Sequence, residues 1–273
     1  MSQSLARAAH EQTESPLDIR IGALDTLLDH AAHVQHPTDL VITPVELHRR
    51  HLKQRLSSAD QPLSAFEFTG GGTVAARLLE PTNEPTRSLD RVDRLDLLEA
   101  ILAREDGPRE YFEILLGGEP TTKVRAVEQT RSEIEAITNY HPTRVRAYRH
   151  MLATLADSIA ADARDALYGA LAVEGALRYH AAKPPTETEL LRRATRQLGQ
   201  ADTDVWQAAY PHVERVGIAG LSNVSAPLID LLTAIARSTS VGATIYLRAA
   251  TGPYLHDRLP HTLVETLGDV YIE

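Results

Sequence analysis

The chain has 273 residues, of which 43% are hydrophobic and 24% charged, enough for one large domain or for a core domain with an insertion. Its formal net charge is −9, it has no apolar run of about 18 residues that would span a membrane, and residues 1–15 are too polar for a secretory signal. It contains no cysteine, which excludes disulfides, thiol catalysis and Cys-ligated zinc. These features predict a cytoplasmic protein with no membrane partner.

The basic residues are almost all arginines. The only lysines are Lys53, Lys123 and Lys183, so 25 of the 28 basic residues are arginine. An acidic, lysine-poor surface is typical of adaptation to a salty cytoplasm, in which carboxylates hold water and ions. A high-GC genome would give the same arginine bias, and the sequence leaves both explanations open.

Three consecutive β–α units are predicted after an expected flexible arm at residues 1–16. In each unit a short apolar or alternating run is followed by residues with helical spacing. The paired segments are 17–22 with 23–35, 39–42 with 44–56, and 63–68 with 73–79. Because three such units joined by short loops favour parallel pairing, we predict a parallel sheet covered by helices.

The second unit carries a local excess of positive charge. Thr43 and Pro44 are expected to begin its helix, with Thr43 as the cap and Pro44 in the first turn. The residues expected to face inward are Val45, Leu47, Leu52 and Leu56, and those expected to face water are Arg49, Arg50, Lys53 and Arg55. Residues 43–55 contain one acidic and four basic residues, which suits a phosphate near the helix start. An ordinary solvated helix face explains the same pattern.

A long helical segment follows the third unit. The predicted helices are 88–104, 108–117, 122–138, 142–163, 164–181, 186–199 and 202–210. Ser88-Leu89-Asp90 is an expected N-terminal cap, and Pro142 and Pro185 lie at expected helix starts. Alternating strand and helix patterns then return, with strands at 214–220 and 241–247 and helices at 226–238 and 261–267. We therefore predict a five-stranded α/β domain, residues 17–80 plus 213–273, split by an all-helical insertion at 81–212.

The motifs of several enzyme classes are missing. The loop after the first strand, residues 22–26, has no lysine for a phosphate, and the strand ending at Gly220 is followed by Leu221, Ser222 and Asn223 where a Mg²⁺-dependent ATPase has acidic residues. The glycines at 70–72 are interpreted as a tight turn or a helix N-terminus. The histidine pairs His30 and His33, and His48 and His51, have no carboxylate at ligand spacing. The sequence therefore predicts no ATP hydrolysis, no metal and no cofactor.

Taken together, these motifs resemble those of superfamily 1 helicases. Residues 39–56 are similar to motif Ia, a strand followed by Thr-Pro and a helix ending in Arg-Leu. Residues 66–79 are similar to motif Ib, residues 216–225 occupy the place of motif II, and residues 243–248 that of the motif III strand. The helical segment occupies the place of the 1B insertion. The resemblance is greatest to the inactivated helicase-like N-terminal part of AddB- and RecC-type helicase–nuclease subunits, and the chain corresponds to one lobe of such a subunit.

The resemblance implies a RecA-like (P-loop-NTPase-like) sheet with a large all-helical insertion, and no ATPase activity. It also implies contact with single-stranded DNA through the residues after the Ia and Ib strands, here Thr43 and Thr69, with Arg49, Arg50 and Lys53 on the adjoining helix. A helicase or nuclease would be the protein partner, and repair or recombination the setting.

Residues 121–150 hold a second group of basic residues. Arg144, Arg146 and Arg149 lie close in sequence with Tyr140 and Tyr148 among them, a composition that holds phosphates and stacks bases. A solvated helix face with i,i+4 pairs explains the same pattern.

Trp206 and Tyr210, one turn apart, are assigned to the core.

The sequence as a whole is compatible with two functions: a catalytically inactive helicase-like module that binds single-stranded or junction DNA, or a protein-interaction subunit without DNA contact.

Overall fold

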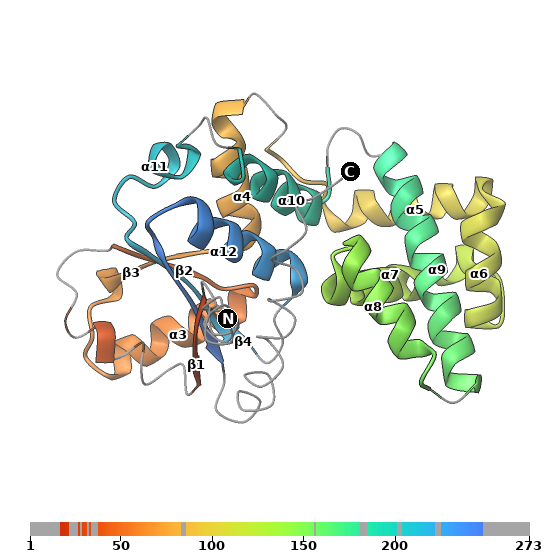
Figure 1. Cartoon of the computed structure of the whole chain (residues 1–273), viewed down its shortest axis with the longest axis horizontal. Helices are drawn as coiled ribbons and strands as arrows, with labels where there is room; N and C mark the ends of the chain where they lie inside the picture. The colour runs from red at the N-terminus through yellow and green to blue at the C-terminus, as the bar shows by residue number, and fades with distance from the viewer. Residues whose placement is uncertain are drawn as a thin grey trace, which may run out of the picture. The chain divides into compact units, whose positions relative to one another are not determined.

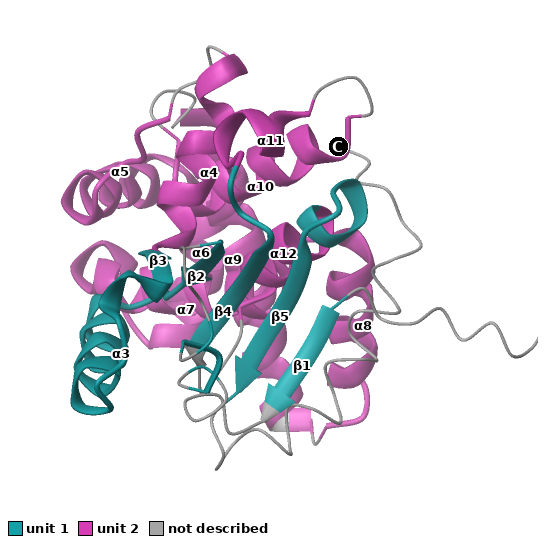
Figure 2. Cartoon of the chain, turned by 90° about the vertical axis from the view of Figure 1, so that its left-hand side faces the viewer, with its two compact units in different colours: residues 1–68, 212–222, 235–268 teal, residues 69–211, 223–234, 269–273 magenta. Residues whose placement is uncertain are grey.

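The computed structural model describes residues 17–21, 27, 29–31, 33, 38–82, 86–155, 157–180, 185–200, 204–221 and 225–247. The chain forms two compact units, shown in Figure 2. Unit 1 comprises residues 1–68, 212–222 and 235–268, and unit 2 comprises residues 69–211, 223–234 and 269–273. The expected arm at residues 1–16 and the expected helix at 261–267 lie outside the described residues.

A five-stranded parallel sheet confirms the predicted α/β class. Its strands run in the order β1 (Leu17–Ile21), β5 (Gly242–Leu247), β4 (Arg215–Leu221), β2 (Asp39–Ile42) and β3 (Phe66–Thr69). All four residues of β2 are buried, as a central parallel strand covered on both faces requires. Strands β4 and β5 pair from Arg215 opposite Gly242 onward, and β5 also pairs with β1. The sheet that contains β1 is therefore completed by strands far from it in the sequence.

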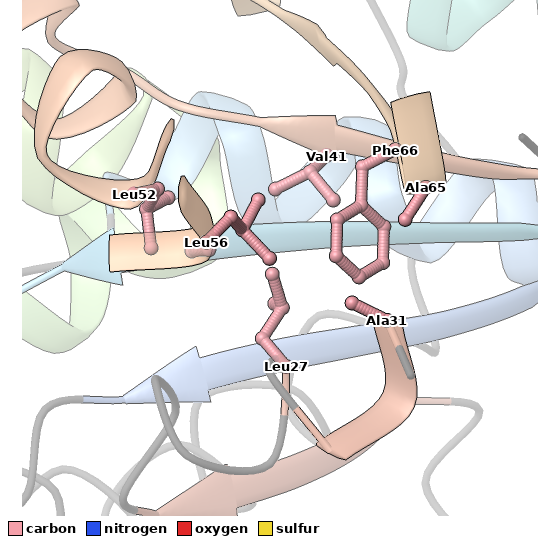
Figure 3. Close-up of a cluster of buried hydrophobic side chains, with 8 residues drawn as sticks. Leu27, Ala31, Val41, Leu52, Leu56, Ala65 and Phe66 are labelled. Carbon is pink, nitrogen blue, oxygen red and sulfur yellow. The ribbon is translucent and has the colours of Figure 1, made fainter. Parts of the chain in front are cut away.

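Helix α3 (Glu46–Ser58) packs on unit 1 through two leucines, Leu52 and Leu56. Figure 3 shows both leucines in one apolar cluster with Leu27, Val41 and Phe66. Leu27 is helical and almost completely buried, in agreement with the helix expected between the first two strands. The cluster thus draws on all three predicted β–α units and also includes Ala219 of β4.

The start of α3 differs from the expectation. The helix begins at Glu46, and its N-cap is Val45, which has an extended backbone and no side-chain cap. Thr43 is buried at the end of β2 instead of capping the helix, and Pro44 precedes the helix instead of lying in its first turn. The restriction that proline places on the residue before it keeps Thr43 extended, so the chain needs two further residues to enter the helix.

Unit 2 is helical apart from its turns, and its helices are seen in Figure 1. They are α4 (Gly71–Leu79), α5 (Arg91–Arg104), α6 (Asp106–Leu116), α7 (Val124–Thr138), α8 (Pro142–Leu152), α9 (Asp157–His180), α10 (Glu187–Leu198) and α11 (Val205–Ala209), with 3-10 turns η2 (Glu80–Thr82) and η3 (Pro120–Lys123). Helix α9 packs against α6, α7 and α5, and α10 packs against α4. Unit 1 contributes its own 3-10 turn, η1 (Leu63–Ala65).

Helix α4 and the first part of α12 (Ala226–Ser238) group with the helical unit, which begins at Thr69. The predicted α/β domain of residues 17–80 plus 213–273 is not tested by this division. The description of residues 81–212 as an insertion into a RecA-like domain stays a prediction.

Most helix ends in unit 2 lie near their predicted positions. The carboxylate of Asp90 accepts hydrogen bonds from the backbone nitrogens of Val92 and Asp93, which confirms the cap at the start of α5. Pro142 is the first residue of α8, also as predicted. The predicted break between 163 and 164 is wrong, because α8 ends at Leu152 and α9 begins at Asp157. No glycine or proline marks residues 153–156, so the sequence carried no signal for that turn.

The glycines at 70–72 form the N-terminus of α4, one of the two predicted roles, with Gly70 as the N-cap. A Cβ atom at Gly71 would lie 2.6 Å from Cδ2 of Leu228, whereas one at Gly72 would lie 2.8 Å from Oε1 of Glu187. Leu228 is buried and Glu187 exposed, so only the glutamate can move aside at little cost. These two glycines therefore differ in how tightly they are packed.

We expect Gly71→Ala to lower the free energy of unfolding by about 1–3 kcal/mol, because an added methyl group overpacks a filled site. Gly72→Ala is the matched control and should change it by less than about 1 kcal/mol, since alanine also favours the helix. Urea unfolding followed by circular dichroism measures both. Equal losses of unfolding free energy in the two variants would contradict the difference in packing between Gly71 and Gly72.

No helix among the described residues is both long and apolar enough to cross a membrane.

Candidate nucleic-acid interface

Two threonines lie where neighbouring strands end. Thr43 directly follows β2, and Thr69 is the last residue of β3, the strand next to it in the sheet. Ligands of open α/β sheets bind at the edge formed by the carboxyl ends of the strands, and contact of Thr43 and Thr69 with a ligand there stays a prediction. Both residues are buried, at 4% and 7% exposure.

Helix α3 presents most of its charge to water. Arg50, Lys53 and Arg55 are exposed, and Arg49 is half-buried. The single acidic residue, Glu46, forms ion pairs with both Arg49 and Arg50, the latter at 3.4 Å. Lys53 lies 5.7 Å above the ring of Phe68. One carboxylate against four cations leaves the helix with a net charge of +3, in a chain whose total is −9.

Two apolar residues at the start of α3 face outward, against the expectation. Val45 is 48% exposed and Leu47 is 70% exposed, whereas Leu52 and Leu56 are buried as predicted. At 100° per residue, Leu47 lies about 140° around the helix from Leu52. An apolar stripe through Leu52 and Leu56 therefore cannot include Leu47, wherever the helix begins.

Arg144 does not belong to an exposed basic cluster. Its guanidinium donates to both carboxylate oxygens of Asp230 on α12, at 2.8 and 2.6 Å, and the two side chains are 8% and 9% exposed. Asn139 donates to the same carboxylate at 2.7 Å. The expected cluster of Arg144, Arg146 and Arg149 is therefore wrong for its first member, because a buried bidentate ion pair already uses that side chain.

The other residues of this segment divide between surface and core. Arg146 and Arg149 are exposed on α8, and the guanidinium of Arg149 lies 5.1 Å from the ring centre of Tyr168. Tyr140 packs in an apolar cluster, and its hydroxyl donates to the backbone oxygen of Arg131 at 2.9 Å. Burial raises the pKa of Tyr140 above its ordinary value, and the charge of Arg131 opposes that shift. Tyr140 is therefore not a base-stacking residue, and Arg146 and Arg149 remain as the candidate contacts.

The assignment of Trp206 and Tyr210 to the core is confirmed. Both side chains are almost completely buried, and their ring centroids lie 4.9 Å apart.

A buried network of charges was not foreseen. Arg131 donates to Glu128 at 2.8 and 3.2 Å, to Glu174 at 2.8 Å and to Glu135 at 3.2 Å. Arg192 on α10 donates to Glu174, Glu135 and Asn139 at 2.8–3.0 Å. The spacing of Glu128, Arg131 and Glu135 on α7 was the one visible signal, but the same spacing is common on exposed helix faces. The network ties α7, α9 and α10 together inside unit 2.

The structure describes only some of the residues on which the predicted absence of ATP hydrolysis and of a metal site depends. The loop at residues 22–26 lies outside the described residues, as do residues 222–224 after β4. Within the described residues, no group of three His, Asp or Glu side chains is arranged to hold a metal ion. His30 instead contacts Asp39 at 2.8 Å, and Arg215 binds the same carboxylate at 2.9 Å.

The sequence model of the halobacterial UvrD-like protein family matches residues 3–273. The chain belongs to this family. No curated protein matches the chain at a significant level. Membership in the UvrD-like family relates the chain to helicase-like proteins, and this agrees with the resemblance of residues 39–56 and 66–79 to helicase motifs.

Proposed function

We propose that the chain is a helicase-like DNA-binding module without ATPase activity. In this proposal it binds single-stranded or junction DNA as the accessory subunit of a helicase or nuclease in repair or recombination. The observation that carries the proposal is the basic α3, which follows β2 directly and has a net charge of +3 in an acidic chain. Membership in the UvrD-like family supports DNA as the polyanion.

The contacts have distinct roles. Thr43 and Thr69 would meet the DNA backbone at the carboxyl edge of the sheet, where the structure has β2 and β3 side by side. Arg49, Arg50 and Lys53 would neutralise phosphates along α3, and Arg146 and Arg149 would do so on α8. The proposal omits Arg144, whose charge Asp230 already balances.

The absence of ATPase activity rests on the sequence. Residues 22–26 offer no lysine for a nucleotide phosphate, and residues 221–223 offer no carboxylate for a magnesium ion. A RecA-like domain of this kind would keep the nucleic-acid contacts of a helicase motor domain but would not hydrolyse ATP. The halobacterial family description is in keeping with a salt-adapted surface.

The test is a fluorescence-anisotropy titration of the whole chain with a labelled single strand at several potassium chloride concentrations. We expect saturable binding whose affinity falls as salt rises, with a slope of about 0.7 in the logarithms for each phosphate contacted. ATP should leave the affinity unchanged. A chain that binds no single strand at any salt concentration would refute the proposal.

A protein-interaction subunit is the second candidate, favoured by one observation. Three exposed apolar residues lie close in sequence: Met151 at the end of α8, Leu155 in the bend that follows, and Ile159 at the start of α9. Exposed apolar side chains are typical of protein interfaces where they form a contiguous patch. The same titration separates the two functions, because a scaffold without DNA contact would give no anisotropy change.

A further inference from the structure

Helix α3 is attached to unit 1 along one narrow stripe. Only Leu52 and Leu56 are buried, and Figure 3 shows them directed into the apolar cluster with Leu27. The remaining residues from Glu46 to Ser58 are exposed or half-buried. Much of the circumference of this 13-residue helix is therefore open to a large partner.

The face opposite that stripe is a continuous ridge. Leu47, Arg50, His51 and Gln54 follow one another at the i, i+3, i+4 and i+7 spacing, which places them on one side of a helix. All four are exposed, Leu47 at 70%. At 100° per residue, the ridge lies about 160–180° from the midpoint of Leu52 and Leu56. The ridge is thus the outermost part of α3.

The ridge has the chemistry of a reader of base edges. Arginine pairs with guanine through its fork of donors, glutamine pairs with adenine, and an apolar side chain meets the thymine methyl group. The major groove is about 12 Å wide and accepts one α-helix of 10–12 Å diameter. Leu47, Arg50 and Gln54 supply one side chain of each kind, along about two turns of the helix.

Cations flank the ridge on both sides. At 100° per residue, Lys53 lies about 110° to one side of its centre and Arg55 about 90° to the other. Phosphates border the major groove on both walls, so a helix in the groove needs positive charge on both flanks. The single carboxylate, Glu46, is in the first turn and is paired with Arg49 and, at 3.4 Å, with Arg50 of the ridge. The distribution of charge around α3 therefore complements a groove between two phosphate backbones.

We propose that the ridge of α3 enters the major groove of double-stranded DNA and contacts its base edges. This inference rests on the proposed function for the identity of the ligand, and adds that the chain reads the duplex arm beside a single strand. A single strand would favour aromatic stacking residues, which the ridge lacks apart from the imidazole of His51. A protein groove would favour apolar anchors at several ridge positions, and only Leu47 is apolar.

The test compares a labelled mixed-sequence hairpin duplex with a single strand of the same length. The main variant is Leu47→Ala/Gln54→Ala, which changes no charge and replaces two exposed side chains, so the fold and the phosphate contacts should be kept. We expect its duplex affinity to fall about tenfold, the size of one lost base contact, and its single-strand affinity to change less than about twofold. Leu63→Ala, an exposed leucine outside α3, is the matched control and should leave both affinities unchanged.

Dimethyl sulfate reports the groove, because it methylates guanine N7 in the major groove and adenine N3 in the minor groove. Bound protein should protect N7 and leave N3 reactive. Arg50→Lys, which keeps the charge and loses the fork, should restore N7 methylation. Protection of N3 alone, or N7 protection that both ridge variants retain, would overturn the inference.

The titrations also distinguish a failure of this inference from a failure of the proposed function on which it rests. A chain that binds the single strand and not the duplex overturns the duplex contact alone. A chain that binds neither overturns both.

Discussion

Replacing Arg131 by methionine should lower the free energy of unfolding by about 3–5 kcal/mol, the usual loss when one partner of a buried ion pair is removed. The Arg131 side chain is 3% exposed and bonds to Glu128, Glu135 and Glu174. Methionine fills part of the space but leaves three buried carboxylates with fewer cations. Chemical unfolding followed by circular dichroism, at one fixed salt concentration, measures the loss.

Arg125→Met is the matched control for this change. Arg125 lies on the same helix, α7, and is exposed, so its loss should change stability by no more than about 0.5 kcal/mol. Equal losses for the two variants would mean that the network adds nothing beyond an ordinary surface arginine.

The effect of Arg131→Met should also depend on pH. Burial acts to raise the pKa of Glu174, but the charges of Arg192, Arg131 and Arg178 outweigh it, so the pKa is lowered. A carboxylate with a lowered pKa stabilises the fold above its unfolded pKa of about 4.3, and this stability is lost as the pH falls through the folded value. Without Arg131 the pKa of the buried Glu174 carboxyl rises, and where it exceeds the unfolded value the variant loses stability as the pH rises. The difference between the proteins should therefore shrink from pH 7 toward pH 4.5, and a constant difference would argue against this account.

Sequence patterns were sufficient where one short segment decides its own structure. The continuous apolar run of β2 identifies a strand that is buried on both faces. The helical spacing of the leucines of α12 identifies a helix that is buried along one side. The N-cap at Asp90 is similarly local. The end of α8 at Leu152 could not be predicted, because no glycine or proline marks residues 153–156.

The candidate site was less predictable because charge does not reveal burial. Arg144 and Arg146 are two residues apart on α8, yet one is buried against Asp230 and the other is exposed. The distinction depends on α12, which lies 86 residues further along the chain. The inward placement of Leu47 failed for a different reason, since at 100° per residue Leu47 lies about 140° from Leu52 wherever α3 begins.

Reversing Arg49, Arg50 and Lys53 to glutamate should reduce affinity for single-stranded DNA at least about 100-fold. The α3 segment would change from +3 to −3, because each of three reversals removes two positive charges. Each phosphate contact contributes about 0.7 to the salt slope for a single strand, so losing three should lower the slope by about 2. Anisotropy titrations across a salt series measure both quantities. The cost to stability should be small, since the pairs with Glu46 are at the surface.

Net charge must be separated from position, because the triple reversal also takes the whole chain from −9 to −15. The matched control reverses Arg104, Arg125 and Arg164, three exposed arginines on α5, α7 and α9, and reaches the same net charge. Long-range repulsion is screened over about 3 Å at 1 M salt, so at that concentration the control should bind as the wild type does. The salt slope separates the two variants, because only contacted phosphates release counterions: the α3 variant should lose about 2 from the slope, whereas the control should keep the wild-type slope. Equal slopes in the two variants would remove α3 from the interface and leave only a diffuse electrostatic effect.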